Sequence, residues 1–93
     1  MSKVFLVATY RPDSDEKLMQ AIRDKYPNNH YSIGRGQWLV AVKGTTAREI
    51  AEQLGIPGET PIRGSYVFGI SGYYGRANGE MWEWMSAKLG EQE

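Results

Sequence analysis

The order in which strand-like and helix-like segments follow one another constrains this 93-residue chain more than any other feature. Residues 3–10, KVFLVATY, form an almost continuous apolar and β-branched run, which is typical of an interior strand buried on both faces. Residues 30–33 predict a short, half-polar strand at an edge. Residues 37–42 and 65–71 predict two further strands, because their apolar side chains alternate between faces.

Helical periodicity and capping residues separate these strands. Asp13 and Glu16 have the spacing of a capping box and place carboxylates at the start of a first helix. Thr46 and Glu49 form a second capping box before a second helix, which Gly55 is predicted to end. The resulting order is strand, helix, strand, strand, helix, strand.

This order predicts an α+β protein with a ferredoxin-like βαββαβ antiparallel sheet and an added C-terminal helix that starts near Asn78. Strands one and three should lie in the middle, and strands two and four at the edges. The glycines that flank Arg35 predict a hairpin turn between strands two and three. Both inner helices should cover one face, so Trp38 or Tyr66 would line the open face unless the terminal helix or another subunit covers them.

Length and composition bound the organisation of the chain. We expect one domain over residues 1–93, with a core of about 3–71 and a C-terminal loop and helix over 72–90. The sequence has no cysteine, which excludes disulfides and thiolate-bound zinc and fits a reducing compartment. It has no apolar leader or long apolar run, so we expect a cytoplasmic protein without a membrane span.

Charge and residue types argue against several chemistries. Eleven basic and eleven acidic residues cancel, which disfavours the broad positive field of a non-specific nucleic-acid-binding protein. His30 is the only histidine, so one chain has no histidine pair for a metal or a proton relay. The segment GISGYYG lacks the Gly-x-Ser-x-Gly spacing of a nucleophile elbow. We therefore expect a binding protein rather than an enzyme, without a metal or cofactor.

Three segments, KVFLVATY, QWLVAV and TTAREIAEQL, carry a family resemblance. With them the core resembles the small ferredoxin-fold proteins of the CRISPR spacer-acquisition nuclease and toxin-like type, which implies homodimers built through sheet edges and C-terminal segments. In the nuclease branch, an aspartate at the end of the first strand holds a divalent cation across the dimer axis. This chain has Thr9, Tyr10 and Arg11 there, and a guanidinium opposes a cation. Asp13 and Asp15 follow, but they are better explained as acids of a helix start.

The glycine-rich segment GYYGRANG is the first candidate ligand site. Its glycines leave backbone amides accessible before a helix, an arginine adds charge, and tyrosines offer stacking faces, which suits a nucleotide or another anionic aromatic ligand. The alternative is a connector whose tyrosines pack under the terminal helix. The predicted ligand-binding residues, from this loop and from elsewhere in the chain, are Tyr73, Tyr74, Arg76, Arg63, Tyr66 and Arg35.

The terminal helix is the second candidate surface. Met81, Trp82 and Met85 share one helical face, whereas Trp84 projects about 200° away from Trp82. Both tryptophans should not enter the same small core, so one should meet another subunit or a partner. We therefore predict an interface formed by Trp82, Trp84 and Met85 and expect a homo-oligomer.

These observations favour a non-enzymatic, oligomeric binding or regulatory module. Its ligand would be a protein partner or a small anionic, nucleotide-like molecule, and a phage or mobile-element inhibitor of host machinery would fit this description. The alternative is a nucleic-acid-binding or metal-dependent nuclease-like protein. The neutral charge and the missing strand-end aspartate count against that alternative.

Overall fold

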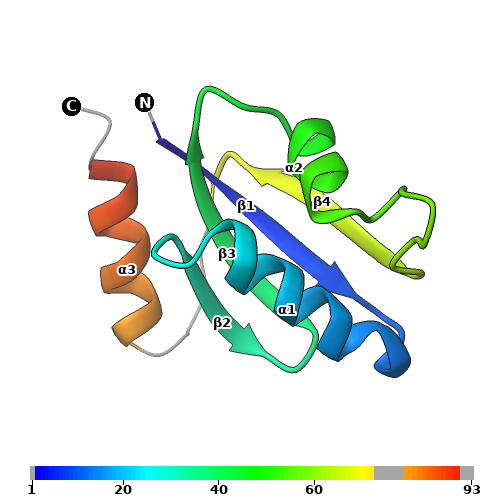
Figure 1. The fold of residues 1–93 in the computed structure, drawn as a ribbon. Coiled ribbons are helices and arrows are strands. Elements are labelled where there is room, and N and C mark those ends of the chain that lie inside the picture. Colours follow the sequence, from blue (N-terminus) through cyan, green and yellow to red (C-terminus); the bar gives the residue numbers. More distant parts are fainter. Residues whose placement is uncertain (1, 73–78, 91–93) are drawn as a thin grey trace.

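A computed structural model describes residues 2–72 and 79–90 of the chain, which form four strands, three α-helices and one short 3₁₀ helix (Figure 1). In chain order the elements are β1 (Ser2–Thr9), η1 (Pro12–Ser14), α1 (Asp15–Lys25), β2 (His30–Gly34), β3 (Gln37–Lys43), α2 (Ala47–Leu54), β4 (Ser65–Ile70) and α3 (Gly79–Gly90). Within the described residues, none of the helices is long and apolar enough to cross a membrane.

The strands form one antiparallel sheet with the order β2-β3-β1-β4. β1 pairs with β3 on one side, where Phe5 lies opposite Val40, and with β4 on the other, where Val7 lies opposite Val67. The α+β class and the central position of the first and third strands are therefore confirmed. Val4, Phe5 and Val7 of β1 are all buried, as expected for an interior strand.

Helices α1 and α2 cover one face of the sheet, and the main core lies beneath them (Figure 1). Leu18 and Ile22 of α1 and Ile50 of α2 are almost completely buried there. The prediction that Trp38 or Tyr66 lines the opposite face holds for Tyr66 and is wrong for Trp38, which belongs to this core. Strand alternation explains the correction, because Trp38 shares its face of β3 with Val40, which packs against the helices.

Helix α3 packs on the opposite face and builds a second cluster with Val4, Leu39, Ala41 and Met85. Trp82 and Trp84 both pack against this cluster and both are only partly buried. Met85 is the α3 residue buried in the cluster. Around the helix axis, Trp82 lies about 60° to one side of Met85 and Trp84 about 100° to the other. Each tryptophan therefore flanks the contact between α3 and the sheet.

The helix ends show which capping predictions hold. The box of Thr46 and Glu49 is present, since the Glu49 amide donates to the Thr46 side chain and the Thr46 amide donates to Glu49 Oε1 at 3.1 Å. Gly55 ends α2 in the left-handed conformation, with φ of 82°. The box proposed for Asp13 is wrong, because Asp13 lies inside η1 and pairs with Arg11 at 3.2 Å.

The β2–β3 turn is a tight hairpin, as the glycines around Arg35 predicted. Gly36 has φ of 73°, which favours glycine, and its carbonyl accepts a hydrogen bond of 2.9 Å from the Thr9 amide. A Cβ atom at position 36 would lie 3.0 Å from the Thr9 carbonyl oxygen. The hairpin tip is thereby held against the end of β1, beside the start of α1.

Candidate functional site

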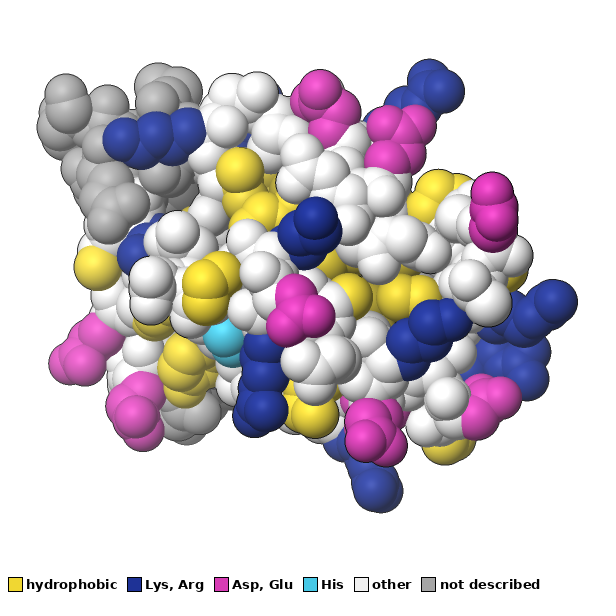
Figure 2. Space-filling view, in the orientation of Figure 1, with side chains coloured by type: hydrophobic (Ala, Val, Ile, Leu, Met, Phe, Trp, Pro, Cys, Tyr) yellow, Lys and Arg dark blue, Asp and Glu magenta, His cyan; other side chains and the backbone are white. Residues whose placement is uncertain are grey.

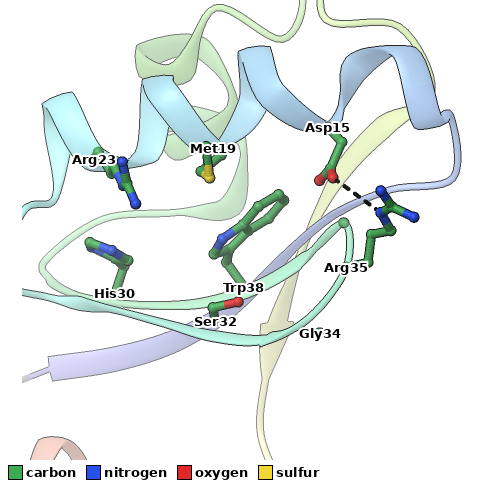
Figure 3. A pocket seen from close by; sticks show the side chains of 9 residues that line it. Asp15, Met19, Arg23, His30, Ser32, Gly34, Arg35 and Trp38 are labelled. Carbon is green, nitrogen blue, oxygen red and sulfur yellow. Dashed lines mark ion pairs between the residues drawn. The ribbon is translucent and has the colours of Figure 1, made fainter.

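A groove of about 310 Å³ lies between α1 and the β2–β3 hairpin (Figure 3). Its walls combine cationic, acidic and apolar side chains from elements that are distant in sequence. The lining residues are Asp15, Met19, Arg23, His30, Ser32, Gly34, Arg35, Gly36 and Trp38.

Regular secondary structure explains why these side chains converge. Asp15, Met19 and Arg23 are four residues apart on α1, so they follow one another along a single helical face. His30 and Ser32 alternate with residues of the opposite face of β2. Figure 3 shows the α1 side chains on one side of the groove, the β2 side chains on the other, and the Trp38 ring between them.

His30 is held in one orientation at the end of the groove. Its Nδ1 atom lies 2.6 Å from the backbone carbonyl oxygen of Tyr26. Because a carbonyl oxygen only accepts hydrogen bonds, Nδ1 must carry the proton and donate it. In the neutral ring Nε2 is then the acceptor, and after protonation it becomes a second donor.

Asp15 lies beneath the hairpin tip and pairs loosely with Arg35. Asp15 Oδ2 is 3.9 Å from Arg35 Nε, which is too long for a hydrogen bond, and the Arg35 side chain is 94% exposed. A surface pair of this kind contributes only about 0–1 kcal/mol. Arg35 is therefore free to exchange Asp15 for another anion.

The other Asp15 oxygen is buried and has no hydrogen-bond partner among the residues that the structure describes. An unsatisfied buried acceptor costs about 1–3 kcal/mol, and more when the group is charged. Helix capping does not explain Asp15, because Ser14 occupies the N-cap position of α1. Oδ1 of Asp15 is thus an unsatisfied acceptor buried in the wall of the groove.

A second hollow, of about 210 Å³, adjoins the groove on the far side of Asp15 and Arg35. It shares Asp15, Arg35 and Gly36 with the groove and adds Thr9, Tyr10, Arg11 and Pro12. The Tyr10 side chain is largely exposed there, at 78%. An exposed aromatic ring next to a proline offers a flat apolar surface.

The groove has a local excess of cationic groups. Arg23 and Arg35 outnumber the single carboxylate of Asp15, and His30 adds a third basic group. Elsewhere on the same side of the molecule, Lys and Arg side chains are interspersed with Asp and Glu (Figure 2). In the described residues, no group of three or more His, Cys, Asp or Glu side chains is placed to hold a metal ion.

The structure distributes the sequence-predicted ligand residues over several places. Arg35 lines the groove. The backbone carbonyl of Arg63 accepts hydrogen bonds from Ser14 Oγ at 2.7 Å and Thr9 Oγ1 at 3.4 Å, so Arg63 supports the start of α1 through its backbone. Tyr66 lies on the α3 side of the sheet, 4.9 Å from Phe68 between ring centroids. The remaining predictions, Tyr73, Tyr74 and Arg76, lie outside the described residues.

The predicted interface residues all lie on α3. Met85 is only 2% exposed, so it offers a partner almost no surface. Trp84 packs against Tyr31 of β2, with ring centroids 5.8 Å apart, and Trp82 is partly buried beside the same cluster. Among the described residues on this side of the sheet, Phe68 of β4 is a large apolar side chain that is exposed, at 58%.

Sequence reasoning missed Asp15, Arg23, His30 and Trp38 as residues of one site. It assigned Asp15 to a helix start and Trp38 to the other face. The sequence signal that was available is the position of Asp15 and Arg23 on one face of α1, followed by a half-polar strand. That spacing also fits an ordinary solvated helix face, so it did not single out the site.

Comparisons of this chain with protein-family models, with curated proteins and with solved structures found no match.

Proposed function

We propose that this protein is a non-enzymatic binding module for a small anionic ligand and that the groove between α1 and the β2–β3 hairpin is its binding site. The observation that carries the proposal is a groove with Met19 and Trp38 in its walls, with Arg23 and His30 at one end and Arg35 beside Asp15 at the other. Small-ligand sites typically combine apolar walls with a few polar groups that converge on the ligand.

The two guanidinium groups suit an anion that has several oxygen atoms. A guanidinium presents several N–H donors in a planar fork that matches carboxylate and phosphate groups. Arg35 is exposed and only loosely paired, so binding an anion would not require a strong ion pair to break. Because the Nδ1–H group of His30 donates to the Tyr26 carbonyl, His30 can donate to an anion only through a protonated Nε2.

Several finer statements accompany this proposal. We propose that the sheet and the two helices between its strands form a ferredoxin-like fold, and that the resemblance to small CRISPR-associated proteins reflects this fold. We also propose a cytoplasmic homo-oligomer; the exposed Phe68 on the edge strand β4 supports self-association. Nucleic-acid binding remains the alternative, and the interspersed charges of the α1/α2 side favour it less.

Calorimetric titration with phosphate, pyrophosphate and ADP tests the binding proposal. Arg23→Ala and Arg35→Ala should each weaken binding of pyrophosphate about tenfold or more, because a hydrogen bond to a charged group contributes about 1.5–3 kcal/mol. Arg48→Ala is the matched control, since Arg48 is an exposed helical arginine outside the groove that pairs with Glu52 at 3.4 Å. Binding that is unchanged in both groove variants, or equally weakened in the control, would refute this site.

A further inference from the structure

The groove and the second hollow share Asp15, Arg35 and Gly36, so one extended ligand can occupy both. We propose that this ligand is a ribonucleoside diphosphate. Its phosphates would lie between Arg23, His30 and Arg35, its ribose hydroxyls would donate to Asp15, and its base would lie on Tyr10. This inference rests on the proposed function, because it names the chemical class of the anion.

Asp15 is the reason to expect hydroxyl groups in the ligand. A carboxylate at the centre of an anion site is unfavourable unless the ligand also brings donors to it. Oδ1 of Asp15 is an unpaired buried acceptor among the described residues, and Oδ2 faces Arg35 at 3.9 Å. The Asp15 side chain is 30% exposed although Oδ1 is buried, so Oδ2 is the oxygen that a ligand can reach. A ribose hydroxyl can donate to Oδ2 when Arg35 turns toward the phosphates.

The second hollow provides the place for a planar base. Tyr10 is largely exposed, and Arg11 and Pro12 line the same hollow. Bases stack on aromatic rings regardless of their hydrogen-bonding edges. The Tyr10 surface lies on one side of Asp15, and Arg23 lies on the other. Tyr10, Asp15 and Arg23 therefore follow the order of base, ribose and phosphate in a nucleotide.

The spacing along α1 favours two phosphates over one. Asp15 and Arg23 are eight residues apart, which corresponds to about 12 Å along the helix axis. Helical side chains lean toward the helix N-terminus, so the long Arg23 side chain shortens this gap toward Asp15. Figure 3 shows Arg23 and His30 together at the end of the groove that is remote from Asp15. A diphosphate bridges such a distance better than a single phosphate.

The test compares ADP with 2′,3′-dideoxy-ADP by calorimetry. The wild-type protein should bind ADP about tenfold more tightly, because the dideoxy compound leaves the Asp15 carboxylate unpaired. Asp15→Ala should reduce this ratio to about one and should strengthen binding of pyrophosphate, since it removes a negative charge. Glu16→Ala is the matched control, because Glu16 is an exposed acid of the same helical turn outside both hollows. It should keep the wild-type ratio.

The outcomes separate the two proposals. Equal affinity of the wild-type protein for ADP and the dideoxy compound overturns the ribonucleotide assignment but leaves anion binding intact. Tighter binding of phenylalanine than of ADP also overturns it, because Asp15 would then pair with an amino group. Failure of ADP, dideoxy-ADP and pyrophosphate to bind overturns both proposals. If Asp15→Ala does not fold, Asp15→Asn, which keeps the shape without the charge, must lower the ADP preference.

Discussion

Two helices, α1 and α2, cover one face of the sheet and enclose the main core, whereas a single helix, α3, covers the other face with methionine and tryptophan side chains. Under α1 and α2, Leu18, Ile22 and Ile50 are almost completely inaccessible to solvent. On the α3 side, Tyr66 and Phe68 of β4 remain partly or largely exposed. The comparison shows that the chain closes one side of its sheet and leaves part of the other side apolar and accessible.

The difference between the two faces follows from the way in which the chain connects each helix to the strands. α1 and α2 each connect two strands of the sheet, so both their ends are fixed by the strands that flank them. Among the described elements, α3 has a neighbouring strand in the chain on one side only, β4. An element attached in this way is expected to open at a lower free energy than the rest of the structure. We therefore expect the α1/α2 side to determine global stability and the α3 side to open locally.

The largest effect is expected from Leu18→Ala. Leu18 is 0% exposed beneath α1, and truncation of such a residue leaves a cavity that costs about 2–5 kcal/mol in the free energy of unfolding. Urea denaturation followed by circular dichroism measures this loss. Glu16→Ala, at an exposed position of the same helix, should change stability by less than about 0.5 kcal/mol. A loss below about 1 kcal/mol for Leu18→Ala would mean that this face does not determine stability.

A smaller global effect is expected from Met85→Ala, although Met85 is as deeply buried as the main-core residues. The truncation should weaken the packing of α3 on β1 and β3, so that α3 opens without unfolding the sheet. Hydrogen exchange should therefore become faster in residues 79–90 while α1 and α2 keep their protection. Glu83→Ala, an exposed position of α3, is the control. Uniform loss of protection would show instead that the two faces unfold as one unit.

The smallest effect concerns Tyr26, which joins the two helices of the closed face. Its hydroxyl donates to Gln53 Oε1 of α2 at 3.1 Å, and burial raises the pKa of Tyr26 above its usual value of 10.0. Above pH 10 the unfolded chain loses this proton while the folded protein keeps it, so the stability contributed by Tyr26 falls as pH rises through that range. Below pH 10 the contribution is fully present.

The comparison of wild type with Tyr26→Phe isolates this contribution from other groups that titrate at high pH. Denaturation at pH 8 and at about pH 10.5–11 should show a steeper loss of stability in the wild-type protein. Tyr31→Phe is the matched control, because Tyr31 lies on the α3 side of the sheet, away from the core beneath α1 and α2. Parallel pH dependence of wild type and Tyr26→Phe would contradict the assignment of this group to the closed core.

The sequence predicted the elements well because each carries a local signal. The apolar run of β1, the capping box at Thr46 and the glycines around Arg35 act within a few residues of one another. The faces of the sheet were harder to assign, and Trp38 was placed on the wrong one. Both faces of β3 are apolar, so alternation alone could not say which face meets α1 and α2.

The candidate site could be predicted only in the case of Arg35. Asp15, Arg23 and His30 come together through the packing of α1 on the hairpin, which no spacing along the chain encodes. Asp15 was also not recognised as a site residue, because acids are common at helix starts and that local role accounts for its position. The unpaired Oδ1 atom of Asp15 can be identified only in the folded structure, where the hairpin lies beside Asp15.

The contact between Gly36 and Thr9 has a consequence for how this site can change during evolution or in the laboratory. Position 36 has a left-handed φ and a close backbone neighbour, so side chains there would displace the turn. Position 35 sits between the two glycines with its side chain in solvent and can accept almost any residue without affecting folding. The hairpin backbone is therefore constrained at position 36, whereas the side chain at position 35 can be exchanged. A library of variants at this single position would sample different ligand preferences on an unchanged scaffold.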